Sequence, residues 1–210
     1  MTFSTDALSR RAVLGGGVLA AGGLIAGQAM AALPAVVARK PTVRPELMRR
    51  ALMALERHGK AIPNRDVIGV ADFSVHSATP RFHFVNLASG ETKTMLVSHG
   101  RGSDPAHSGM LQRFSNEVGS AASSQGAYRT DDLYVGKHGR SRRLTGLDIT
   151  NNNAEPRAVV VHGAWYANPD VIAQHGKLGR SEGCFAFAEA QIEEVLARLG
   201  AGRMIYAEKV

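Results

Sequence analysis

The chain is poor in cysteine and in aromatic side chains. Its 210 residues include a single cysteine, Cys184, and a single tryptophan, and Phe, Trp and Tyr together make up 6% of the sequence. One cysteine excludes an internal disulfide bond and any zinc site built from paired cysteines. Beyond the N-terminal segment the sequence also lacks low-complexity tracts and repeats of 20 to 50 residues, which argues against a solenoid architecture.

The overall composition is that of a globular protein with a basic surface. Hydrophobic residues make up 44% and charged residues 20%, which excludes a wholly disordered chain. The 23 glycines favour a fold with many turns over a helix bundle. The formal net charge of +7 suits a polyanionic partner, such as nucleic acid, an anionic membrane or a cell-wall polymer. Nucleic-acid binding rests on charge alone, since the basic cluster of Arg140, Arg142 and Arg143 is typical of a solvated face, and we expect no such partner.

The N-terminus has the pattern of an export signal. Arg10 and Arg11 precede a stretch from residue 12 to residue 38 that carries no charge, and Ala29-Met30-Ala31 matches a small-residue cleavage site. The paired arginines and the glycine-rich apolar run predict a twin-arginine signal peptide over residues 1–31. The alternative is an uncleaved N-terminal anchor, because the run is long enough to span a bilayer. With cleavage we expect a periplasmic protein without a stable membrane span.

The remainder is predicted to be one domain. We expect a linker over residues 32–44, an N-terminal helical segment over 45–64 and a single domain, mainly β with flanking helices, over 65–210. Pro45 suits a helix start, Leu47, Ala51 and Leu55 share one helical face, and Gly59 ends the segment. A second helix is predicted around 192–199, and Gly100 to Gly126 is predicted to be a long loop. Strands are predicted over 67–73, 81–87, 92–98, 128–135, 144–149, 158–161 and 204–207.

Cys184 is the first candidate for chemistry. It lies in Gly179-Arg-Ser-Glu-Gly-Cys-Phe-Ala186, so closely spaced glycines place it in a turn that a substrate can approach. The structural alternative is a small buried hydrophobe. A reactive thiol needs a base, and an imidazole at a strand end is the usual one. His162 follows the β-branched run Val159–Val161, whereas His99 and His138 also lie beside glycines, and the residues alone do not decide among the three.

The sequence fits two other catalytic patterns less well. Residues 179–183 match the G-x-S-x-G elbow of α/β-hydrolases with Ser181 as nucleophile, but that fold needs a downstream histidine and the last one is His175. A zinc peptidase would need H-E-x-x-H or an equivalent spacing, which the chain lacks. We therefore expect no metal site.

The two motifs around His162 and Cys184 together resemble the murein L,D-transpeptidase catalytic-domain family. Val-Val-Val-His162-Gly163 followed by Ser181-Glu-Gly-Cys184 is similar to the strand-end His-Gly and the Ser-x-Gly-Cys turn of that family. The resemblance extends over residues 67–207, through His99-Gly100, Phe114-Ser-Asn116, Gly119-Ser120, Gly126-Ala-Tyr128 and Gly136-Lys-His-Gly139. It implies an L,D-transpeptidase-type β-sandwich that acts on peptidoglycan stem peptides without a metal or organic cofactor.

The resemblance also implies roles for individual residues. Cys184 would form a thioester with the stem peptide and His162 would be the base, with Gly183, Ser181 and Gly163 supporting the oxyanion and the turn. The outcome would be a 3–3 cross-link or, with water, release of D-Ala. Substrate-binding candidates are Arg180, His99, Asn116, Ser120, Tyr128 and His138.

Three departures from the family pattern stand out. Glu182 replaces a second histidine, Phe185-Ala186 follows the cysteine, and the catalytic pair is 22 positions apart because of an insertion over residues 165–176. A carboxylate beside the thiol would hinder thiolate formation unless a cation such as Arg180 offset it. The alternative function is therefore a weakly catalytic or non-catalytic peptidoglycan-binding or regulatory domain of the same fold.

Overall fold

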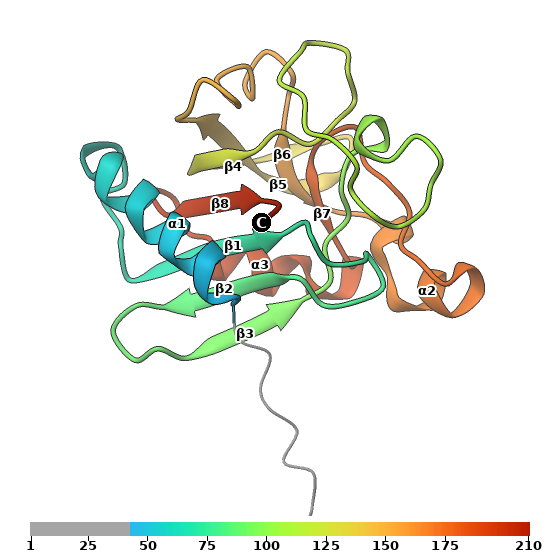
Figure 1. Ribbon diagram of the computed structural model, residues 1–210, viewed down its shortest axis with the longest axis horizontal. Coiled ribbons are helices and arrows are strands. Elements are labelled where there is room, and N and C mark those ends of the chain that lie inside the picture. Colours follow the sequence, from blue (N-terminus) through green and yellow to red (C-terminus); the bar gives the residue numbers. More distant parts are fainter. Residues whose placement is uncertain (1–42) are drawn as a thin grey trace, which may run out of the picture. The chain divides into compact units, whose positions relative to one another are not determined.

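A mixed sheet of eight strands forms the centre of the fold, which the computed structural model describes for residues 43–210 (Figure 1). The predicted signal peptide and most of the predicted linker lie outside these residues. The strand order is β3-β2-β1-β8-β4-β5-β6-β7. The strands are β1 Val67–Asp72, β2 Phe82–Asn86, β3 Thr92–Met95, β4 Gly126–Gly136, β5 Gly139–Gly146, β6 Val160–Gly163, β7 Phe185–Phe187 and β8 Met204–Glu208.

The two edges of the sheet meet. Just beyond β3, Ser98 forms an antiparallel bridge to Ala186 of β7, and its N–H donates to the Ala186 carbonyl oxygen at 2.9 Å. Gly100 forms a second, parallel bridge to Ser181. The sheet thereby curls around its own interior, and the bridges fix residues 98–100 against the chain on both sides of Cys184.

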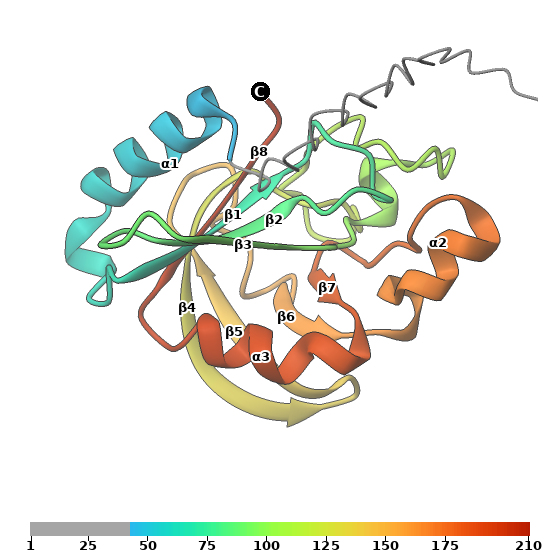
Figure 2. The same ribbon diagram turned by 90° about the horizontal axis from the view of Figure 1, so that it is seen from below.

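Helices pack against both faces of the sheet around β1 and β2. On one side α1 Pro45–Arg57 packs Leu47, Ala51 and Leu55 against Ile68 and Val70 of β1. Because side chains alternate along a strand, Ala71 faces the opposite way, into the main core with α3 Ile192–Arg198. That core holds six aromatic rings, namely those of Phe73, Phe82, Phe84, Tyr128, Phe185 and Phe187. Figure 2 shows α1 and α3 on opposite sides of these strands.

The predicted fold class, mainly β with flanking helices in a single domain, is confirmed. The helix from Pro45, the β2–β3 hairpin and the long loop after Gly100 lie where the sequence predicts them. The strand predicted over 144–149 lies earlier, because β5 begins directly after a tight turn at residues 136–139. Two short elements were not predicted: α2 Pro169–His175 and β7.

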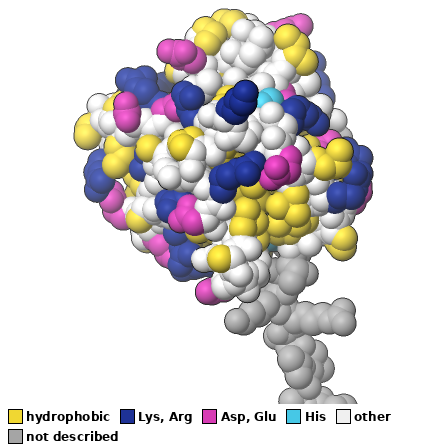
Figure 3. All heavy atoms as spheres, turned by 90° about the vertical axis from the view of Figure 1, so that its left-hand side faces the viewer, with side chains coloured by type: hydrophobic (Ala, Val, Ile, Leu, Met, Phe, Trp, Pro, Cys, Tyr) yellow, Lys and Arg dark blue, Asp and Glu magenta, His cyan; other side chains and the backbone are white. Residues whose placement is uncertain are grey.

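One face of the molecule carries charges of both signs. On the face shown in Figure 3, Lys and Arg side chains alternate with Asp and Glu, and apolar side chains lie between them. Among the helices of residues 43–210, none combines the length and hydropathy that a bilayer span needs.

Candidate active site

Cys184 lies in a bend immediately before β7, and backbone bonds hold that bend from both sides. The Ser181 N–H donates to the His99 carbonyl oxygen at 2.9 Å, and the Arg101 N–H donates to the Ser181 carbonyl oxygen at 2.8 Å. Within the turn, the Ser181 hydroxyl donates to the Cys184 carbonyl oxygen at 2.7 Å and accepts the Gly183 N–H at 3.2 Å. Both capacities of the Ser181 hydroxyl thus serve the turn, which gives this side chain a supporting position.

Gly183 is required where it stands. Its φ is +112°, and a Cβ there would lie 2.6 Å from the Ala122 carbonyl oxygen and 3.0 Å from Arg157 Nη2. A side chain at this position would meet both an unfavourable backbone conformation and the long loop behind it. The glycine therefore lets the turn pack directly against residue 122.

His162 and Cys184 occupy neighbouring parallel strands. The ladder between β6 and β7 pairs Val161 with Phe185 and His162 with Ala186. Continuing that register by one residue places Cys184 opposite Val160, two positions before His162. Because alternate residues of a strand share a face, the thiol and the imidazole lie on the same face of the sheet.

The His162 ring is buried, and its tautomer follows from its contacts. Nδ1 lies 2.9 Å from the Gly163 carbonyl oxygen, which can only accept, so Nδ1 carries the proton and Nε2 keeps a lone pair. The His138 ring stacks on it at 4.1 Å with an interplanar angle of 20°. Burial lowers the pKa of His162 to about 4, and the nearby His138 and Lys137 lower it further. The imidazole is therefore neutral at pH 7 and able to accept a proton.

Both side chains line one pocket of about 430 Å³. In it the Cys184 thiol donates to the Ala158 carbonyl oxygen at 3.6 Å. Burial raises the pKa of Cys184, while the Val160 N–H and the charges of Lys137 and Arg157 lower it. Glu182 contributes only the smallest upward influence on this pKa, and its carboxylate pairs with Arg101 at 3.0 Å. The resting pair is thus a neutral thiol beside a neutral imidazole.

Arg157 is a site residue that sequence reasoning missed. Nη1 donates to the Ser115 carbonyl oxygen at 2.9 Å and to Ser124 Oγ at 3.1 Å, and Nη2 donates to the Ala122 carbonyl oxygen. It ties the long loop to the pocket that holds the thiol. No motif marks it, because it reaches the pocket from a series of turns that ends at Ala158, a residue with φ of +52°. Tyr134 and Tyr166 line the same pocket and were also missed.

Several of the predicted site residues come together. His138, Arg180 and Ser181 line the pocket with Cys184 and His162, and Gly183 forms the turn beside it. Arg180 donates to the carbonyl oxygens of Asp104 and Pro105, and it also lines an adjoining cavity of about 320 Å³ that contains Ser120. Gly163 follows the base directly, and a Cβ there would lie 3.2 Å from Ile192 Cβ.

Three predicted substrate-binding residues lie elsewhere. His99 is buried, with Nδ1 2.7 Å from Arg81 Nη2 and Nε2 3.5 Å from Asp104 Oδ2. Tyr128 is fully buried, and its hydroxyl donates to the Ser124 carbonyl oxygen at 2.7 Å. The Asn116 amide bonds to the Ile149 carbonyl oxygen at 3.0 Å and to Asn152 Oδ1 at 2.7 Å. Their contacts support the loops and the core around the pocket.

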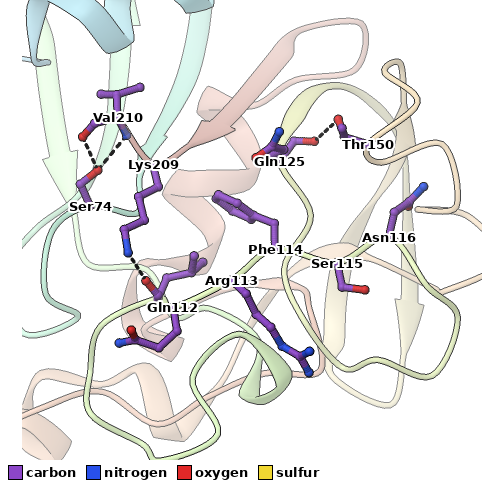
Figure 4. A pocket seen from close by; sticks show the side chains of 11 residues that line it. Ser74, Gln112, Arg113, Phe114, Ser115, Asn116, Gln125, Thr150, Lys209 and Val210 are labelled. Carbon is purple, nitrogen blue, oxygen red and sulfur yellow. Dashed lines mark hydrogen bonds between the residues drawn. The ribbon is translucent and has the colours of Figure 1, made fainter.

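A further cavity, of about 720 Å³, has neither Cys184 nor His162 in its lining (Figure 4). Its walls come from residues 111–116, from Gln125 and Thr150, and from Ser74, Lys209 and Val210. Of the predicted site residues it contains only Asn116. Ser115 lies in its wall and accepts a hydrogen bond from Arg157, which lines the pocket of Cys184, so this bond links the walls of the two cavities. Within residues 43–210 no group of His, Cys, Asp and Glu side chains is arranged to hold a metal ion.

A thiol and a neutral imidazole in one pocket of a curled β-sheet define the class of site. The family model for the L,D-transpeptidase catalytic domain matches residues 39–207, and the chain belongs to that family.

Solved structures give a more distant likeness. An L,D-transpeptidase from Mycobacterium tuberculosis H37Rv is 17% identical with a TM-score of 0.43, and the match covers 69% of this chain and 58% of that one. L,D-transpeptidase 3 from M. tuberculosis is 18% identical with a TM-score of 0.43, covering 69% and 61%. An L,D-transpeptidase from Mycobacterium smegmatis is 17% identical with a TM-score of 0.41, covering 68% and 58%. The chain thus spans less than two thirds of these proteins, and no curated protein matches it.

Proposed function

We propose that the protein is a cysteine L,D-transpeptidase that acts on peptidoglycan stem peptides through a thioester on Cys184. The observation that carries the proposal is the shared pocket of Cys184 and His162, in which Nε2 of the imidazole is left as a proton acceptor. The substrate bond is the one between the L-centre of diaminopimelate and the terminal D-Ala.

The reaction follows from the two neutral groups. The sulfur attacks the substrate carbonyl while His162 Nε2 takes the thiol proton, and the resulting imidazolium gives that proton to the nitrogen of the leaving D-Ala. The C–N bond breaks and a thioester remains on Cys184. An amine of a second stem then attacks the thioester, His162 accepts its proton, and the thiol is restored as the cross-link forms. Water in place of the amine gives the L,D-carboxypeptidase reaction.

The burial of both groups determines how the proton moves. Since the pKa of Cys184 is raised and that of His162 is lowered, a thiolate–imidazolium pair is not the resting state. Proton transfer therefore accompanies the attack on the carbonyl rather than preceding it. The Gly183 N–H is bound to Ser181 Oγ at 3.2 Å, so its use as an oxyanion donor requires the exchange of this bond.

The charges of the pocket fit such a substrate. Lys137, Arg157 and Arg180 line it, and the acidic side chain in its wall, Glu182, is already paired with Arg101. Stem peptides carry several carboxylates, which these cations would neutralise.

The same proposal includes export to the periplasm by the twin-arginine route with removal of residues 1–31. N-terminal sequencing of the protein purified from the cell envelope tests it. A mature protein that begins at Met1 would contradict the cleavage.

Acylation by a carbapenem tests the nucleophile and the base. The wild-type protein is expected to gain the mass of one carbapenem on Cys184, whereas Cys184→Ala gains none and His162→Gln gains it at least 100-fold more slowly. His175→Ala serves as the control, because His175 is exposed on α2 and does not line the pocket. The same proteins are then incubated with disaccharide-tetrapeptides, and cross-linked dimers and tripeptides are identified by mass. A folded wild-type protein that forms no adduct on Cys184 would overturn the proposal.

A further inference from the structure

The single tryptophan of the chain is exposed beside the active-site pocket. Trp165 is 68% exposed and begins a short 3-10 turn, Trp165–Ala167, three positions after His162. Tryptophan has the largest apolar surface of all side chains, and side chains of this kind are normally covered in a folded protein. Its exposure next to a catalytic pocket points to a ligand that covers it.

The turn that carries Trp165 is held on a fixed base. The Ala164 N–H donates to the Phe187 carbonyl oxygen at 2.9 Å, which ties the start of the turn to β7. The Gly179 N–H donates to the Tyr166 carbonyl oxygen at 2.8 Å, which ties the end of the insertion back to its start. Ala167 is fully buried. The indole is thus presented by a rigid element, which lowers the entropic cost of binding.

The indole contacts an aromatic ring that lines the pocket. Trp165 and Tyr166 contact edge to face, with ring centroids 5.9 Å apart and an interplanar angle of 80°. Tyr166 itself lines the pocket of Cys184. A substrate held at the thiol can therefore continue past Tyr166 onto Trp165 without leaving the protein surface.

We propose that Trp165 binds the glycan strand that carries the stem peptide, by stacking on the C–H face of a pyranose ring. The inference rests on the function proposed above, in which the reacting peptide is attached to a sugar. A pyranose ring is similar in size to an indole, and the indole N–H can donate to an acetamido oxygen. A lone flat ring suits a sugar better than a membrane, which needs a broad apolar face with flanking cations.

Intrinsic fluorescence tests the contact independently of catalysis. Because the chain has one tryptophan, its emission reports on Trp165 alone. The full chain with Cys184→Ala is titrated with disaccharide-tetrapeptide, with an N-acetylglucosamine oligomer and with sugar-free tetrapeptide. A saturable shift in emission with the two sugars, and none with the free peptide, is the expected result. No change with either sugar, at concentrations at which the disaccharide-tetrapeptide is shown to bind by calorimetry, would overturn the inference.

A kinetic comparison separates a sugar contact from a structural role. For each variant we compare kcat/KM on the disaccharide-tetrapeptide with kcat/KM on the sugar-free tetrapeptide. Trp165→Ala is expected to lower this ratio about 3- to 10-fold through KM, and Trp165→Phe to restore most of it. Leu52→Ala, at an exposed apolar residue of α1, is the matched control and should leave the ratio unchanged.

An equal loss on both substrates would mean that Trp165 only supports the fold, and would refute the sugar contact. A wild-type protein that turns over neither peptide, yet gives the fluorescence shift with sugar, would instead count against the proposed reaction and leave the glycan contact standing.

Discussion

Replacing Gly183 with alanine measures how closely the nucleophile's turn is held by the loop behind it. At φ of +112°, a Cβ would lie 2.6 Å from the Ala122 carbonyl oxygen and 3.0 Å from Arg157 Nη2. The positive φ costs an L-residue about 1–2 kcal/mol. Forcing extra atoms into a packed contact adds about 1–3 kcal/mol. We therefore expect Gly183→Ala to lower the free energy of unfolding by about 2–5 kcal/mol.

Gly90→Ala is the matched control for the backbone term. Gly90 has φ of +72° in the β2–β3 turn, and nothing lies within 4 Å of a Cβ built there. It should cost about 1–2 kcal/mol. The difference between the two variants therefore measures the contact with residues 122 and 157 together with the extra backbone strain of φ +112° over φ +72°. Urea unfolding followed by circular dichroism gives both values.

The same contact controls catalysis. If the turn must move to relieve the overlap, the sulfur shifts relative to His162, and the rate of carbapenem acylation should fall roughly 10- to 100-fold in the folded variant. Gly90→Ala should be acylated at the wild-type rate. The reasoning is refuted if Gly183→Ala unfolds no more easily than Gly90→Ala and is acylated as fast as the wild type.

Three further predictions concern the groups around the sulfur. The pKa of His162 is lowered from 6.5 to about 4, so the unfolded state binds more protons than the folded state between these values, and the free energy of unfolding should fall by about 2–3 kcal/mol from pH 7 to pH 4.5. Urea midpoints at the two pH values should therefore differ less for His162→Gln than for the wild type. An equal difference would contradict the shift. Arg157→Met should lower the free energy of unfolding by about 2–4 kcal/mol, because the hydrogen bonds of the guanidinium are lost. Because the positive charge of Arg157 lowers the pKa of Cys184, the pH midpoint of Cys184 alkylation should also move upward. An unchanged midpoint would exclude an influence of Arg157 on the thiol. His138→Phe, which keeps a ring against His162, should retain most of the carbapenem acylation rate, whereas His138→Ala loses roughly 10- to 100-fold; equal rates would mean that the stacking does not position the base.

Local signals predicted the elements whose own residues determine them. The β2–β3 hairpin has a turn at Gly90 between two short strand-like runs, and α1 begins at Pro45 with a regular apolar face. By contrast, β7 is three residues long and exists because β6 and Ser98 offer it partners on both sides. Helix α2 is as long as α3, but Val171 is its one buried residue, so it lacks the apolar face that predicted α3.

The same distinction applies to the site. Cys184 and His162 could be singled out because glycines and a β-branched run surround them in the chain. Arg157 could not, because its importance comes from acceptors at Ser115, Ala122 and Ser124, which lie at least 33 positions away in the chain. His99 was a candidate site residue because it lies beside a glycine at the end of a predicted strand. The structure buries it against Arg81 and Asp104, which the sequence could not show.

The long loop from Gly100 to Gly126 sets the position of the nucleophile. One end of it bridges to Ser181, the residue that hydrogen-bonds across the Cys184 turn. Its returning part places the Ala122 carbonyl oxygen where it both accepts from Arg157 and packs against Gly183. A segment with little regular structure thus forms the back wall of the turn, and the sulfur is fixed only once this loop, β6 and β7 have assembled. Substitutions at Ala122 should consequently affect acylation as strongly as substitutions in the turn itself, although residue 122 does not line the pocket.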